Sequence, residues 1–161
     1  MMDAAQVKRI VVPTDFSEAS SVAEAFGVRV AEKFGAEVLL VHIAEDPYVS
    51  LTSAAYPGAP LTLDIDKLRG EIRAECEARL REWRERIPAA VRSRAIFRFG
   101  KAFVEIIRVA REENADLIVI GTHGRTGLRH MIIGSVAEKV VRKARIPVLT
   151  VRPDAHEFEL P

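Results

Sequence analysis

The feature that most constrains the fold is a regular alternation of short apolar runs with amphipathic stretches. The apolar runs predict strands over residues 10–12, 37–43, 91–99, 117–120 and 146–151. The stretches between them predict helices over residues 17–34, 63–87, 102–113 and 134–143. Strands that alternate with helices in this way pair in parallel through right-handed crossovers, with helices on both faces of the sheet. The sequence therefore predicts an α/β protein.

Several segments carry more specific predictions. Apolar residues four apart predict one buried face on the first helix, and they are Val22, Phe26, Val30 and Phe34. The proline-rich segment 46–62 predicts a long loop that serves as a lid or a contact surface. Strict alternation over 91–99 predicts an edge strand with one wetter face.

Length and composition indicate one soluble domain. The 161 residues fit a single domain over 1–161, with a core over about 6–152 and a short tail. Hydrophobic residues make up 48% of the chain and charged residues 29%, which excludes disorder. The net charge of +1 disfavours nucleic-acid binding. No apolar run approaches the roughly 18 residues of a membrane span, so we expect no membrane insertion. We expect a cytoplasmic protein.

Cys76 and His42 are predicted to have structural rather than functional roles. The chain has one cysteine, Cys76, so no intrachain disulfide can form. Cys76 falls on the apolar stripe of the long helix, which favours a buried, inert thiol. His42 ends the second strand, and we expect it to be packed and hydrogen-bonded.

The segment after the fourth strand carries the strongest functional signal. Residues 121–135 contain four glycines and four arginine or histidine side chains, and they end where a helix begins. Glycines let backbone N–H groups approach a ligand, and a helix N-terminus favours phosphate. Ser135 could cap that helix or donate its hydroxyl to a phosphate oxygen. A tight turn followed by an ordinary cap is the structural alternative, but two glycine clusters around a basic stretch favour anion binding.

This segment resembles a known signature. Gly121-x-x-Gly124, nine further residues and then Gly134-Ser135 is similar to the ATP-binding signature of the universal stress proteins. Residues 11–18, 115–124, 135–140 and 146–151 also resemble segments of that family. The resemblance implies an open five-stranded parallel sheet of order 3-2-1-4-5. It also implies a Rossmann-like fold of the adenine nucleotide α-hydrolase-like type, and the ATP-binding branch of the family.

The resemblance implies a nucleotide site for ATP with Mg²⁺. The residues matched to it are Pro13, Thr14, Asp15, Val41, Gly121, Thr122, His123, Gly124, Arg125, Gly134, Ser135 and Val136. Asp15 would contact the ribose or adenine side, or a divalent cation. Its spacing to Glu18 equally fits a capping box, so Asp15 could cap the first helix instead. Pro13, Thr14 and Val41 would line the adenine pocket, and strand-end packing is the alternative without the family.

The loop residues have alternatives of their own. His123 would donate to a phosphate or to the ribose, and a solvent-exposed loop histidine is the alternative. Arg125 is expected to have a minor electrostatic role. No metal site is expected from protein ligands alone, because no pair of histidines has zinc-ligand spacing.

Motifs for other nucleotide and hydrolase chemistry are missing. The sequence has no P-loop, no Gly-x-Gly-x-x-Gly after the first strand and no Gly-x-Ser-x-Gly elbow. We therefore expect a regulatory module whose nucleotide state alters the binding of an unknown protein partner. A slow ATPase or phosphotransferase using Asp15 or His123 is the alternative, and a structural dimer with a vestigial site is a third. The last strand, 146–152, predicts a homodimer edge because Val148, Leu149 and Val151 carry no protective charge, and the resemblance also implies a homodimer.

Overall fold

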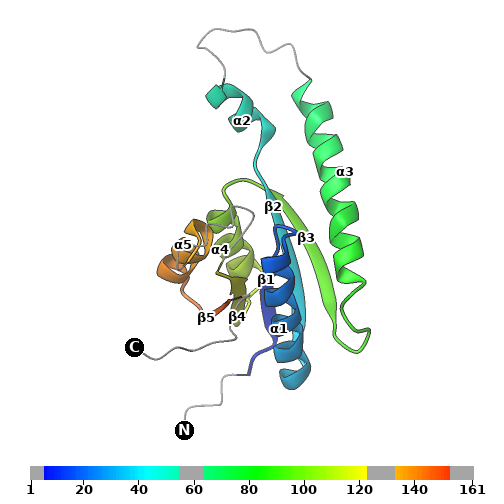
Figure 1. Ribbon diagram of the computed structural model, residues 1–161, viewed down its shortest axis with the longest axis vertical. Coiled ribbons are helices and arrows are strands. Elements are labelled where there is room, and N and C mark those ends of the chain that lie inside the picture. Colours follow the sequence, from blue (N-terminus) through cyan, green and yellow to red (C-terminus); the bar gives the residue numbers. More distant parts are fainter. Residues whose placement is uncertain (1–5, 55–63, 123–132, 153–161) are drawn as a thin grey trace.

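The computed structural model describes residues 6–54, 64–122 and 133–152 (Figure 1). Five parallel strands form one sheet in the order β3-β2-β1-β4-β5. The strands are β1 (Arg9–Pro13), β2 (Glu37–Ala44), β3 (Ser93–Phe99), β4 (Leu117–Gly121) and β5 (Val148–Val151). The predicted strand order is confirmed, and β3 and β5 occupy the two edges as expected.

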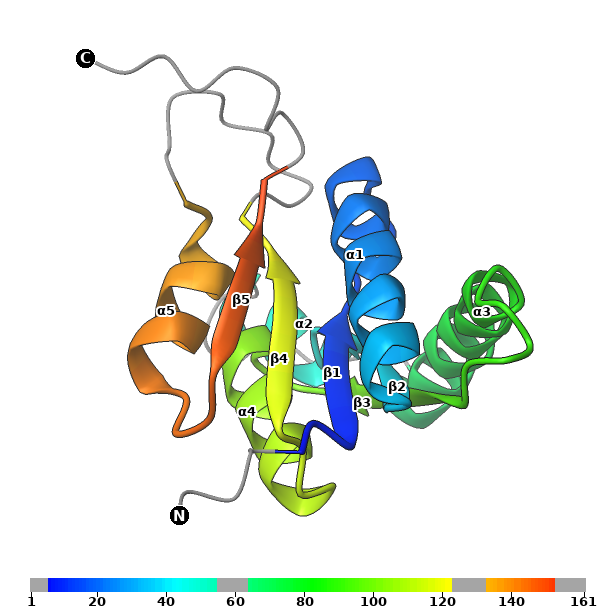
Figure 2. The ribbon, with the colours of Figure 1, turned by 90° about the horizontal axis from the view of Figure 1, so that it is seen from below.

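Helices cover both faces of this sheet, as Figure 2 shows. They are α1 (Glu18–Phe34), α2 (Pro47–Ala54), α3 (Ile65–Arg84), α4 (Ala102–Glu112) and α5 (Ser135–Lys143). One apolar cluster joins α1 and α3 to the sheet, and a second joins α4 and α5 to its other face. The central strands β1, β2 and β4 are therefore buried on both sides, which explains why their sequences are continuous apolar runs.

The buried face of α1 differs from the prediction. Phe26 and Phe34, which were expected to point inward, are 42% and 54% exposed. The residues that α1 buries are smaller for the most part: Ser20, Ala23, Glu24, Gly27, Val28 and Ala31. At Gly27 an added Cβ would lie only 2.8 Å from Val12 Cγ2 on β1. The helix lies so close to the sheet that small residues face it, and the large aromatic side chains turn outward.

The prediction of a loop over 46–62 is wrong in its first half, where α2 forms. Asp46 precedes this helix, and its carboxylate accepts a hydrogen bond from the Tyr48 N–H at 2.9 Å. Pro47 occupies the first helical position, where its missing N–H costs nothing. The Arg69 side chain of α3 donates to both carboxylate oxygens of Asp46, at 3.0 and 2.7 Å. The guanidinium of Arg69 also holds the pKa of Asp46 below its usual value.

Candidate functional site

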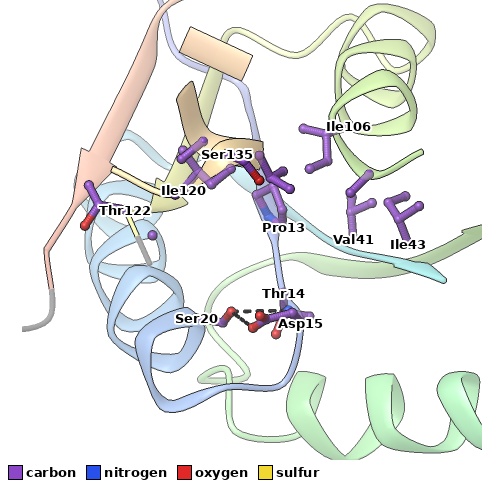
Figure 3. Close-up of a pocket in the computed structure, with 15 residues that line it drawn as sticks. Pro13, Thr14, Asp15, Ser20, Val41, Ile43, Ile106, Ile120, Thr122 and Ser135 are labelled. Carbon is purple, nitrogen blue, oxygen red and sulfur yellow. Dashed lines mark hydrogen bonds between the residues drawn. The ribbon is translucent and has the colours of Figure 1, made fainter. Parts of the chain in front are cut away.

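A pocket of about 290 Å³ opens at the carboxyl ends of the central strands (Figure 3). In a parallel α/β sheet this edge, near the point where the strand order reverses, is where ligands bind. Residues of the turn after β1, of β2 and β4, and of helices α1, α4 and α5 line the pocket. They are Pro13, Thr14, Asp15, Ser20, Val41, Ile43, Ala102, Ile106, Ile120, Gly121, Thr122, Gly134, Ser135, Val136 and Ala137.

The structure brings the described candidate residues together. Nine of the twelve positions matched to the nucleotide site line this one pocket: Pro13, Thr14, Asp15, Val41, Gly121, Thr122, Gly134, Ser135 and Val136. The other three, His123, Gly124 and Arg125, lie outside the described residues. The pocket thus joins segments more than 100 positions apart in the sequence, while the binding role of each residue remains a prediction.

Six lining residues were not predicted from the sequence: Ser20, Ile43, Ala102, Ile106, Ile120 and Ala137. Strand periodicity could have found Ile43, because it lies two residues beyond Val41 and so points to the same face of the sheet. Helix periodicity relates Ala102 to Ile106, which are one turn apart on α4. Nothing in the sequence indicates that α4 starts beside the pocket, since that placement comes from the tertiary packing.

The turn after β1 fixes the Asp15 carboxylate at the pocket wall. One carboxylate oxygen accepts hydrogen bonds from the Ser17 N–H, at 3.0 Å, and from the Ser20 hydroxyl. The Asp15 N–H in turn donates to Ser20 Oγ at 3.2 Å, and Figure 3 shows these two side chains facing each other. The N-cap of α1 is Ser17, whose side chain accepts from the Ser20 N–H. The capping-box alternative for Asp15 is therefore wrong.

Two neighbouring residues of β2 hold the backbone of Thr14. Its N–H donates to the Val41 carbonyl at 2.8 Å, which continues the β1–β2 pairing beyond the end of β1. His42 Nδ1 lies 2.8 Å from the Thr14 carbonyl oxygen, and because that oxygen can only accept, Nδ1 carries the proton. His42 is 5% exposed, so the prediction of a packed, hydrogen-bonded histidine is confirmed.

The opposite wall is the junction of β4 with α5. The Thr122 N–H donates to the Val151 carbonyl at 2.9 Å, and the Gly134 N–H donates to the Thr122 carbonyl at 2.5 Å. Both ends of the glycine-rich segment are thereby joined at the pocket. Gly134 is the N-cap of α5, so Ser135 is the first helical residue, and the alternative in which Ser135 caps the helix is wrong. The first N–H groups of a helix have no acceptor within it and favour an anion.

The pocket has two chemically different ends. Val41, Ile43 and Ile106 form an apolar wall, whereas the start of α5 supplies backbone N–H groups. Asp15 contributes a carboxylate to the same pocket. Among the residues that the structure describes, no three His, Cys, Asp or Glu side chains cluster as a metal site. A divalent cation would therefore need ligands from the bound molecule as well as from Asp15.

Comparison with known proteins decides the family. The model of the universal stress protein family matches residues 6–152, which is most of the chain. The chain belongs to the universal stress protein family. Universal stress protein MJ0531 of Methanocaldococcus jannaschii is 34% identical over 152 residues, which cover 93% of this chain and 85% of that protein.

Solved structures of other universal stress proteins share this fold. The structure of MJ0577, which is also from M. jannaschii, has a TM-score of 0.74 at 26% identity and covers 91% of this chain and 96% of that chain. The universal stress protein of Archaeoglobus fulgidus in complex with dAMP has a TM-score of 0.61 at 25% identity, covering 90% and 98%. In the described part of the present chain, no helix is long and apolar enough to span a membrane.

Proposed function

We propose that this universal stress protein binds ATP with Mg²⁺ in the pocket and acts as a regulatory module rather than as a committed enzyme. The observation that carries the proposal is the pairing, in one cavity of about 290 Å³, of an apolar wall with the start of α5, whose N-cap Gly134 makes no side-chain cap hydrogen bond. A flat, largely apolar base suits the apolar wall, and a phosphate chain suits the start of the helix. The complex of the A. fulgidus relative with dAMP supports an adenine nucleotide as the ligand.

Each part of the nucleotide then has a partner of suitable chemistry. The base would pack against Val41, Ile43 and Ile106, and the phosphates would accept hydrogen bonds from the first N–H groups of α5. Asp15 would accept a hydrogen bond from a ribose hydroxyl. A carboxylate beside phosphates is repulsive unless a cation intervenes, so Asp15 also fits a ligand of Mg²⁺. Mg²⁺ is usually held by one or two carboxylates together with phosphate oxygens and water, which matches this donor set.

The regulatory part of the proposal rests on surfaces beyond the pocket. The edge strand β5 pairs with β4 on one side, and no described strand pairs with its other side. Val148, Leu149 and Val151 give this edge no charge to protect it from further pairing. We propose that two copies pair along β5 to form a homodimer, which sedimentation can test. Because Thr122 donates to Val151, the nucleotide pocket borders that edge, and its occupancy can influence partner binding.

Filling the cavity tests where the ligand binds. Ala102 is the first residue of α4 and lines the pocket, so an Ala102→Trp side chain would occupy the space proposed for the base. We expect the Kd for MgATP, measured by calorimetry, to rise at least about tenfold, which corresponds to about 1.4 kcal/mol. Arg111→Trp, at an exposed position of the same helix, is the matched control and should bind as the wild type does. Equal affinities for both variants would place the nucleotide elsewhere.

A further inference from the structure

Phe16, which directly follows Asp15 in the turn after β1, has an unusual backbone conformation. Its φ is +63°, in the left-handed region. A bulky side chain rarely adopts this region, because the conformation costs on the order of 1 kcal/mol and persists only where the surroundings hold it in place. Asn114, the other described residue apart from glycine with positive φ, belongs to a residue type that tolerates it. At Phe16 the surroundings must therefore impose the conformation.

The Phe16 side chain supplies that constraint. Its ring centroid lies 4.3 Å from the ring of His42 on β2 and 5.6 Å from the ring of Trp83 on α3, which it meets edge to face. The Arg79 guanidinium, also on α3, lies over the same ring at 4.1 Å. The Phe16 N–H donates to Thr14 Oγ1 at 3.0 Å. The ring is thus anchored to β2 and α3, whereas the neighbouring Asp15 lines the pocket.

We infer that Phe16 is a positioning residue for Asp15 and couples the pocket to the docking of α3. Two consecutive residues of one tight turn contact two different parts of the molecule: Asp15 the pocket, and Phe16 the pair Arg79 and Trp83. Rotation of this turn would move both side chains together. The inference rests on the proposed function, because it concerns how the nucleotide pocket keeps its carboxylate in place. The element whose position responds to the ligand is then α3.

The chain carries its own probe for this coupling. Trp83 is the single tryptophan, it is 7% exposed, and it contacts the Phe16 ring directly. If MgATP fixes Asp15 and hence Phe16, the emission of Trp83 should change on binding. The same change should be lost when the Phe16 ring is removed, even at saturating nucleotide.

A double-mutant cycle separates positioning from a merely structural role. Phe16→Leu, Asp15→Ala and the double variant are titrated with MgATP by calorimetry, and their folding is checked by circular dichroism. If Phe16 acts through Asp15, each single variant should weaken binding about tenfold, and the double variant should bind no worse than Asp15→Ala. Phe16→Tyr, which keeps the ring, should restore affinity and the Trp83 response. Phe34→Leu, which removes an exposed ring at the end of α1, is the matched control and should bind normally.

The outcomes are distinguishable. The positioning role would be overturned if the losses of binding free energy in the two single variants add up in the double variant. A change in Trp83 emission that survives Phe16→Leu would overturn it as well. Neither result would contradict nucleotide binding by the wild type. If Phe16→Leu does not fold, Phe16→Gly replaces it in the cycle, because glycine adopts the same φ without strain. Failure of the wild type itself to bind MgATP would overturn both the proposed function and this inference.

Discussion

Gly27→Leu is expected to destabilise the protein by about 3 kcal/mol, the upper range for overpacking a tightly packed interior. The reason is the closeness of α1 to the sheet: a Cβ at Gly27 would lie 2.8 Å from Val12 Cγ2 and 3.6 Å from Val119 Cβ. Both valines are fully buried on central strands. Urea unfolding of the purified variant measures the loss.

The matched control for this change lies on another helix. Gly70 is exposed on α3, and a Cβ added there meets nothing within 4 Å. Gly70→Leu should therefore leave stability unchanged or raise it by about 0.5–1 kcal/mol, because leucine favours a helix more than glycine does. Similar urea midpoints of unfolding for Gly27→Leu and Gly70→Leu would contradict the close contact between α1 and the sheet.

The second large effect concerns Glu24, a carboxyl group buried on the sheet side of α1. Its Oε2 has no hydrogen-bond partner among the described residues. Burial raises the pKa of Glu24 from its usual 4.5 to about 7, although the positive charge of Arg86 counteracts part of the shift. Below pH 4.5 the group is protonated in both the folded and the unfolded chain. Between pH 4.5 and 7 the folded state holds the proton more tightly, so stability falls as the pH rises and stays lower above pH 7.

Glu24→Gln should remove the pH dependence of stability that arises from Glu24, since the amide does not titrate. Relative to the variant, we expect the wild type to lose about 3 kcal/mol between pH 4.5 and 7.5, or about 9 °C in Tm. Thermal unfolding at a series of pH values measures the difference between the two proteins. Glu32→Gln, at an exposed position of the same helix, should follow the wild-type profile. A constant difference between wild type and Glu24→Gln across this range would show that Glu24 does not titrate as described.

The sheet and its topology could be predicted because they depend on patterns within single segments. Apolar runs such as Val38–Ile43 mark strands that are covered on both faces, and the helical stretches between them require parallel pairing. Strand order came from the family resemblance rather than from periodicity. The face of α1 could not be predicted in the same way, because hydrophobicity favours Phe26, whereas the distance to β1 favours Gly27.

The candidate site, like the fold, could be predicted from the sequence only in part. The positions around Gly134 were predicted from the signature, and those around Asp15 from the resemblance of residues 11–18 to the family. Ala102 and Ala137 were missed, since a small apolar residue becomes a pocket wall only through the helix that places it there. The helix α2 was missed because prolines suggested a loop, although an aspartate followed by proline also fits the start of a helix. The strained turn at Phe16 has no local sequence signal, because its φ is imposed by His42, Arg79 and Trp83.

Calorimetric titration of the nucleotide-free wild-type protein with MgATP, and with MgGTP as the comparison, tests the central claim most directly. We expect saturable binding of MgATP near one molecule per chain, with MgGTP at least about tenfold weaker. Such a result would establish one site per chain that prefers an adenine nucleotide, and the Ala102→Trp comparison would then locate it in the pocket. No heat of binding with MgATP at two temperatures would contradict the proposal that this pocket is a nucleotide site.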